Sequence, residues 1–208
     1  MKLTPARVLL IAAALGATVA GFYLARQLDR GSPALASGTW FPQARALADF
    51  DLVDGDGRPF TRQDLAGAPT LVFFGFTHCP DVCPTTLLKL TQVLKAAQVP
   101  RLRVLFISID PQRDTPQAVA QYARAFDPSF RGLTGEPAAI SALATRFGVA
   151  VNRVELPGGD YTMDHSAVVF LLNDEAQIAA IFTPPFEVRP FAADLRAAAP
   201  YLIKRGGH

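Results

Sequence analysis

The chain has few of the residues that build disulfide scaffolds and metal clusters, with only two cysteines and three histidines among 208 residues. This scarcity excludes a disulfide-dense scaffold or a multi-zinc module and leaves room for at most one small thiol or metal site. An excess of one charge is also lacking, because 20 Lys and Arg against 18 Asp and Glu give a net charge of only +2. Without a broad basic face, the chain is not expected to bind nucleic acid.

Apolar residues are abundant, at 50% of the chain against 18% charged residues, with a mean hydropathy of +0.22. This balance excludes a disordered chain, and the length is too short for several domains. The composition therefore predicts one globular domain with a short appendage.

The appendage is an uncharged run from Val8 to Leu24, bounded by Arg7 and Arg26. A helix of about 17 apolar residues is at the short end of what spans a bilayer, and the flanking arginines can snorkel to its two surfaces. The alternative is a cleaved signal peptide with its cleavage site at Ala34–Ala36, but such sites usually follow the apolar run more closely. We therefore expect an uncleaved amino-terminal transmembrane helix.

Three regions follow from this interpretation: a membrane anchor over residues 1–30, a linker over residues 31–40 and a globular domain over residues 41–208. The linker is rich in Gly, Pro and Ser and matches neither a helical nor a strand period. Because the anchor stands at the start of the chain, the domain is expected on the outer side of the membrane.

The globular part alternates strand and helix patterns. Thr70–Gly75 and Val104–Ile109 are short apolar runs typical of buried strands, and the helical periodicity of Thr85–Gln98 lies between them. Such a unit implies two parallel strands joined by a right-handed crossover. Further helices are expected at residues 116–126, 137–147 and 188–199, and further strands at 149–154, 166–172 and 177–182. The turn at Asn173–Ala176 is expected to join the last two strands into a hairpin. The pattern predicts an α/β fold in which helices flank a mixed sheet, as in thioredoxin-like domains.

Both cysteines lie in the segment from Thr77 to Pro84, between the first predicted strand and its helix. Open α/β sheets bind ligands at the carboxyl ends of their strands, and a helix amino terminus is expected to stabilise a thiolate and lower the thiol pKa. The spacing from Cys79 to Cys83 is C-x-x-x-C, one residue longer than a thioredoxin-type redox motif. Two thiolates with one imidazole would favour copper, above all Cu(I), whereas structural zinc normally needs four protein ligands.

Three histidines are candidates for the imidazole. His78 is adjacent to Cys79, and neighbouring side chains in an extended loop point apart. His208 ends the chain, where fraying is expected. His165 remains, just before a predicted strand, and Asp164 is a candidate to orient its ring. A structural disulfide and a structural histidine are the alternatives that residue types and spacing leave open.

Four segments together resemble the Sco/SenC family of copper-handling proteins: Phe73–Pro84, Ser108–Pro116, Phe126–Gly135 and Asp164–Ser166. The likeness extends over about residues 50–200. It implies a thioredoxin-like fold, copper ligation by Cys79, Cys83 and His165, and a domain that faces the periplasm or the mitochondrial intermembrane space on one membrane anchor. The role it implies is assembly of the dinuclear copper centre in subunit II of cytochrome c oxidase, with another copper chaperone as a candidate donor.

The resemblance admits more than one biochemical role. A copper carrier, a thiol-disulfide reductase that prepares the cysteines of the target, and a redox sensor would all use the same two thiols. His165 separates the first two, because copper coordination needs an imidazole and simple disulfide exchange does not. The sequence interpretation is a copper metallochaperone, with the thiol-disulfide reductase as the alternative.

Overall fold

The computed structural model describes residue 11, residues 14–22 and residues 32–203. The chain divides into two compact units, Met1–Ser32 and Pro33–His208. In the first unit, residues 14–22 are helical, while much of the predicted anchor lies outside the described residues. Within the described ranges no helix combines the length and the apolar character needed to cross a membrane.

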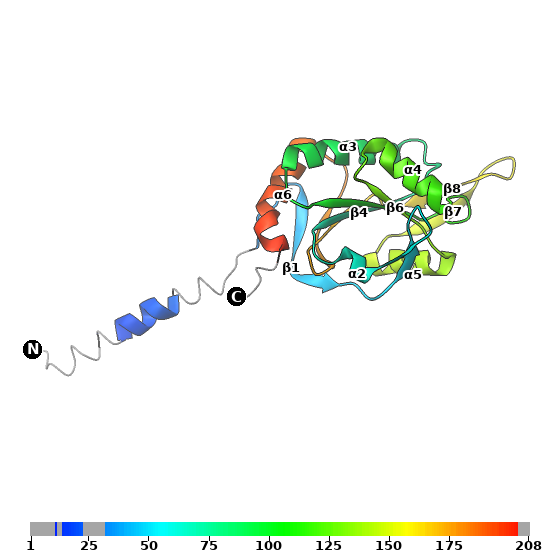
Figure 1. Cartoon of the computed structure of the whole chain (residues 1–208). Helices are drawn as coiled ribbons and strands as arrows, with labels where there is room; N and C mark the ends of the chain where they lie inside the picture. The colour runs from blue at the N-terminus through cyan, green and yellow to red at the C-terminus, as the bar shows by residue number, and fades with distance from the viewer. Residues whose placement is uncertain (1–10, 12–13, 23–31, 204–208) are drawn as a thin grey trace, which may run out of the picture. The chain divides into compact units, whose positions relative to one another are not determined.

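A six-stranded mixed sheet forms the centre of the second unit (Figure 1). Its strand order is β1-β10-β9-β4-β5-β6. The strands are β1 (Gly38–Ala46), β4 (Thr70–Gly75), β5 (Arg103–Ser108), β6 (Arg131–Leu133), β9 (Val169–Leu172) and β10 (Gln177–Phe182). β4, β5 and β6 run parallel, whereas β9 is antiparallel to both β4 and β10, and β1 is antiparallel to β10.

Helices cover both faces of this sheet (Figure 1). Two of them, α3 (Val82–Ala97) and α4 (Pro116–Phe126), lie on one face, where α3 also packs against α6 (Val188–Leu202). On the other face lie α2 (Arg62–Leu65) and α5 (Pro137–Phe147). The predicted α/β architecture is confirmed, and it is consistent with a thioredoxin-like fold.

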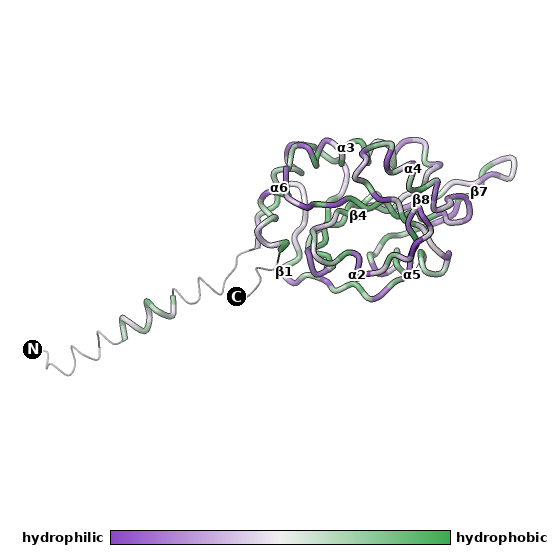
Figure 2. The backbone as a smooth tube through the Cα atoms, viewed as in Figure 1, coloured by the Kyte–Doolittle hydropathy of each residue, from purple (hydrophilic) through white to green (hydrophobic). Residues whose placement is uncertain are grey.

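The core follows from the hydrophobic runs in the sequence. All six residues of β4 are buried, as are five of the six in β5, because helices cover both faces of these central strands. Figure 2 shows the hydrophobic colour concentrated on the central strands and the hydrophilic colour on the outer turns. Aromatic rings from β4, β9 and α5 interlock there, with Phe74, Phe147 and Phe170 in mutual edge contact.

Most predicted elements are present, with shifted ends. The strand at β4 and the helices at α4 and α5 have the predicted bounds. The β9–β10 hairpin is also confirmed, although β9 is shorter than predicted. The strand predicted at 149–154 is present as β7 (Val151–Glu155), but it pairs with an unpredicted strand, β8 (Tyr161–His165), in a small antiparallel sheet of its own. A second small antiparallel sheet, β2 (Asp51–Val53) with β3 (Pro59–Thr61), was not predicted.

The prediction that residues 31–40 form an irregular linker is wrong for their last part. Strand β1 begins at Gly38 and pairs with β10, which supplies hydrogen bonds that no local periodicity reveals. At the start of this strand, the backbone amides of Ala36, Ser37 and Gly38 donate hydrogen bonds of 2.7–3.0 Å to the buried carboxylate of Asp194 on α6. This contact fixes the start of the domain on its last helix.

Candidate metal centre

The two cysteines occupy different environments at the junction of β4 and α3. Cys79 lies in the connecting loop and is half-buried, whereas Cys83 is the second residue of α3 and is fully buried. A Cβ atom added at Gly75 would lie 2.8 Å from the Cys83 Sγ, so the end of β4 can approach this sulfur only because residue 75 has no side chain. No disulfide joins the two cysteines.

The amino terminus of α3 contributes directly to this arrangement. The backbone amide of Cys83 donates a hydrogen bond to the Cys79 Sγ over 3.4 Å. An amide in the first helical turn has no partner within the helix, so it is free to serve a sulfur. Of the two sulfurs, the Cys79 Sγ is therefore the one that receives a hydrogen bond from an amide of α3.

His165 reaches the same place from 82 residues further along the chain. Its Nε2 lies 3.5 Å from the Cys83 Sγ, and its Nδ1 lies 3.2 Å from the carbonyl oxygen of Ser166. Because a carbonyl only accepts, Nδ1 carries the proton and the lone pair of Nε2 is available on the side of the sulfur. The rings of Phe73 and Phe76 lie edge-on to the imidazole, with centroids 6.0 and 6.2 Å away.

The sheet register explains this convergence. Val169, at the start of β9, pairs with Phe73 near the end of antiparallel β4. The chain entering β9 therefore passes beside the loop that leaves β4, as the sequence interpretation expected for His165. His165 itself is the last residue of β8 rather than part of a loop.

Burial sets the protonation states of this pair. Loss of hydration raises the pKa of the Cys83 thiol well above its ordinary value, which contradicts the prediction that the helix amino terminus lowers it. For His165 burial lowers the pKa, with the Ser166 carbonyl and the Asp164 charge opposing the shift. The imidazole is consequently neutral at neutral pH, and its Nε2 can bind a metal directly. Cys83, in contrast, must lose a proton before its sulfur binds a metal.

The other residues singled out in the sequence lie around this pair. His78 lies beside Asp114, with 3.4 Å between its Nδ1 and the Asp114 Oδ1. The exposed carboxylate of Asp164 favours the charged form of His165, while the hydrogen-bonding position at Nδ1 that we expected it to fill is taken by Ser166. Met163 packs on the edge of the core. Asp81 is the N-cap residue of α3, but its carboxylate accepts from the Thr85 hydroxyl instead of a backbone amide.

The structure brings Cys83 and His165 into direct contact and places Cys79 against the Cys83 amide. Within the described part of the chain, no three His, Cys, Asp or Glu side chains stand close enough together to hold a metal ion as they are placed. Ligation by the trio therefore stays a prediction. Chemically, two thiols and one neutral imidazole form a soft donor set suited to copper.

Sequence reasoning missed the carboxylate that holds the cysteine loop. Asp114 is fully buried and accepts hydrogen bonds from the Thr77 amide at 2.9 Å, the Thr77 hydroxyl at 2.5 Å and the Ser108 hydroxyl at 2.6 Å. The segment Ser108–Pro116 was recognised as part of the family resemblance without a structural role. Its concentration of Asp and Arg directly after a buried strand is the signal that could have revealed one.

The fold and the site together define a thioredoxin-like α/β domain that carries a thiol pair and an imidazole at the carboxyl end of its central strand. The profile of the SCO1/SenC family matches residues 41–199, and the chain belongs to this family.

A curated relative supports this membership. A mitochondrial SCO1 homolog of Arabidopsis thaliana is 36% identical over 158 residues, which cover 74% of this chain and 47% of that protein. The chain therefore matches about half the length of that relative.

Two solved structures with copper bound are similar to this one. ScoI of Arabidopsis thaliana has a TM-score of 0.70 and 34% identity, and ScoI of Bradyrhizobium japonicum has a TM-score of 0.64 and 39% identity. Each match covers 74% of this chain and 98% of the other.

Proposed function

We propose that this chain is a copper metallochaperone in which Cys79, Cys83 and His165 bind the metal as cargo. The observation that carries the proposal is the approach of His165 Nε2 to Cys83 Sγ at 3.5 Å across 82 residues of chain. A disulfide reductase has no need of an imidazole at this position, whereas a copper site with two sulfurs does. The relatives with copper bound add support from similarity.

The recipient that we propose is the dinuclear copper centre in subunit II of cytochrome c oxidase, as the family resemblance implies. Two reduced thiols would hold Cu(I), and the imidazole would complete a three-ligand site for Cu(II). Cys79 is the more accessible sulfur and would be the first to exchange its metal with a recipient.

One observation favours the reductase alternative. Cys79 is half-buried and hydrogen-bonded to a helix amide, while Cys83 is fully buried behind it. An accessible thiol backed by a buried one is the arrangement in which the first attacks a disulfide and the second resolves the mixed disulfide. The same thiols could therefore reduce the target's cysteines before metal arrives.

A transfer experiment separates the two roles. The reduced protein loaded with one equivalent of Cu(I) is mixed with a metal-free subunit II copper domain whose cysteines are already reduced. We expect copper to move to that domain, and a Cys79→Ser, Cys83→Ser double variant to deliver none. The metal-free protein is also mixed with the oxidised domain. Reduction of that domain without any copper transfer in the first mixture would support the reductase instead.

We further propose that the apolar segment at residues 8–24 anchors the domain to the inner membrane, with the domain in the periplasm. The alternative cleavage site is an unfavourable place for a protease. The amides on both sides of the Ala36–Ser37 bond donate to Asp194, so this bond is part of the domain. We therefore expect the protein isolated from membranes to retain its first residues when its amino terminus is sequenced. A mature chain beginning at Ser37 would contradict the anchor.

A further inference from the structure

The loop that carries Cys79 and the hairpin that carries His165 are both fastened to one short turn, Ser108–Asp114. The turn follows β5, beside the end of β4. On one side, Asp114 holds the cysteine loop through the amide and the hydroxyl of Thr77. The Ser108 hydroxyl donates a hydrogen bond to the same carboxylate, with 2.6 Å between the two oxygens.

On the other side, Asp110 holds the hairpin. Its buried carboxylate accepts a hydrogen bond from the Tyr161 hydroxyl at 2.8 Å, and Arg113 donates to it at 2.6 Å. Arg113 also donates to the Tyr161 carbonyl at 2.9 Å and lies over the Tyr161 ring at 3.7 Å. Arg153 covers the other face of that ring at 3.6 Å and donates to Gln112 at 3.1 Å.

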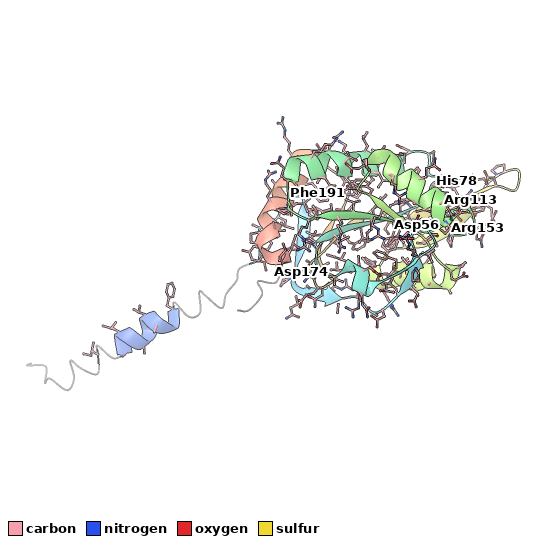
Figure 3. The ribbon with its side chains drawn as sticks, viewed as in Figure 1. Asp56, His78, Arg113, Arg153, Asp174 and Phe191 are labelled. Carbon is pink, nitrogen blue, oxygen red and sulfur yellow. The ribbon has the colours of Figure 1, made fainter. Side chains whose placement is uncertain are left out.

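Tyr161 is thus clasped between two guanidinium groups while its hydroxyl is held by a buried carboxylate. Figure 3 shows Arg113, Arg153 and His78 at the end of the globular domain where β7 and β8 lie. Cation–π contacts of this kind strengthen when the cation loses water, and the Arg113 side chain is largely buried. Tyr161 is therefore a firm point of attachment for the hairpin.

The β7–β8 hairpin would be only marginally stable without an attachment to the rest of the domain. β7 and β8 form a two-stranded sheet of their own, separate from the six-stranded sheet, and an isolated hairpin is only marginally stable. Tyr161 and His165 are the first and last residues of β8, and even spacing places them on the same face of the strand. Fixing Tyr161 consequently fixes the direction in which β8 delivers His165 to Cys83.

We propose that the Ser108–Asp114 turn is a brace that sets the spacing between the cysteines and His165, with Asp110 and Tyr161 as positioning residues for the imidazole. The inference deepens the proposed function and rests on it for its copper consequences. The competing explanation is that apolar packing of Val151 and Met163 against the core positions the hairpin and that the polar clasp is incidental.

The brace is tested first in the reduced protein without copper. Tyr161→Phe removes only the hydroxyl that reaches Asp110 and keeps the ring between the two arginines. We expect the NMR contacts between the His165 and Phe76 rings to weaken and amide exchange in β8 to become about tenfold faster. Tyr201→Phe, which removes a hydroxyl on α6 far along the chain, is the matched control and should change neither. Asp110→Asn is the second variant and should act like Tyr161→Phe.

Copper binding gives a second readout that general destabilisation does not imitate. Loss of a group that orients a histidine ligand typically costs 10–100-fold in metal affinity, so we expect Tyr161→Phe to weaken Cu(II) binding about tenfold while Cu(I) affinity stays unchanged. Unaltered ring contacts and Cu(II) affinity in Tyr161→Phe would overturn the brace. If the wild-type protein bound copper without coordination by the His165 imidazole, the proposed copper site would be wrong. The ring contacts measured without metal would still test the brace.

Discussion

Replacing His165 with alanine is expected to lower the affinity for Cu(II) by more than about 100-fold, because groups that merely orient a ligand already account for 10–100-fold. The variant keeps both thiols. Two thiolates can hold Cu(I) in near-linear geometry, so Cu(I) binding should fall far less. Titration of the reduced protein with each ion, followed by the thiolate-to-copper absorption of the Cu(II) form, measures both effects.

His78→Ala is the matched control for this experiment. His78 is adjacent to Cys79 but turns its ring toward Asp114, and its side chain is 55% exposed. Removing it deletes an imidazole of the same kind from the same loop without touching the proposed ligands. We expect its Cu(II) affinity to stay close to that of the wild type. Equal losses in the two variants would mean that the imidazoles act through the fold of the loop and not as ligands.

The His165→Ala variant also separates carrier from reductase in cells. The thiols keep their helix-terminal position, so reduction of a disulfide substrate should change little. Delivery of copper should fail first when copper is scarce. Normal assembly of the oxidase copper centre at limiting copper in cells carrying His165→Ala would remove the main support for the carrier and favour the reductase.

The sequence pattern placed His165 next to the cysteine loop, and the structure brings its Nε2 to 3.5 Å from the Cys83 Sγ. Continuous apolar runs identified β4 and β5 as buried parallel strands, and the turn at Asn173–Ala176 identified the β9–β10 hairpin. Because β9 lies antiparallel beside β4, the start of β9 must lie next to the end of β4. The meeting of distant residues was therefore a consequence of topology.

The environment of Cys83 could not be predicted in the same way. The helical periodicity predicted that α3 starts at Thr85, but the first helical turn also accepts Pro84 because its amides have no helical partners. The helix starts at Val82 instead and includes Cys83 in its buried first turn. A sulfur whose pKa was expected to be lowered by the helix amino terminus is thus desolvated, and its pKa is raised.

The strand at β7 was predicted, but its pairing with β8 was missed although the turn between them is visible in the sequence. Gly158 and Gly159 both adopt positive φ, at +90° and +86°, as tight turns often require. Strand β8 lacks the alternation of buried and exposed residues that reveals strands, so no partner for the strand predicted at 149–154 was recognised. What holds this hairpin in place is the clasp around Tyr161, and long-range polar contacts of that kind leave no period in a sequence.

Oxidation of Cys79 and Cys83 to a disulfide is expected to abolish copper binding at this site, with a loss in affinity of at least about a thousandfold. A disulfide has no thiolate to offer, and only the His165 imidazole would remain, which is insufficient to hold Cu(I). The reduced protein, in contrast, should release protons as it takes up copper, since burial keeps the Cys83 thiol protonated beforehand.

The measurement is a titration of oxidised and reduced protein side by side, with proton release recorded in weak buffer. A Cys79→Ser, Cys83→Ser double variant serves as the control for sites elsewhere on the chain, because it lacks both thiols under reducing and oxidising conditions alike. Addition of a reductant to the oxidised wild type should restore copper uptake, while the double variant should not respond. Equal copper uptake by the oxidised and reduced wild-type protein would place the metal on other residues, since a site built on these two sulfurs cannot bind its cargo until both are free.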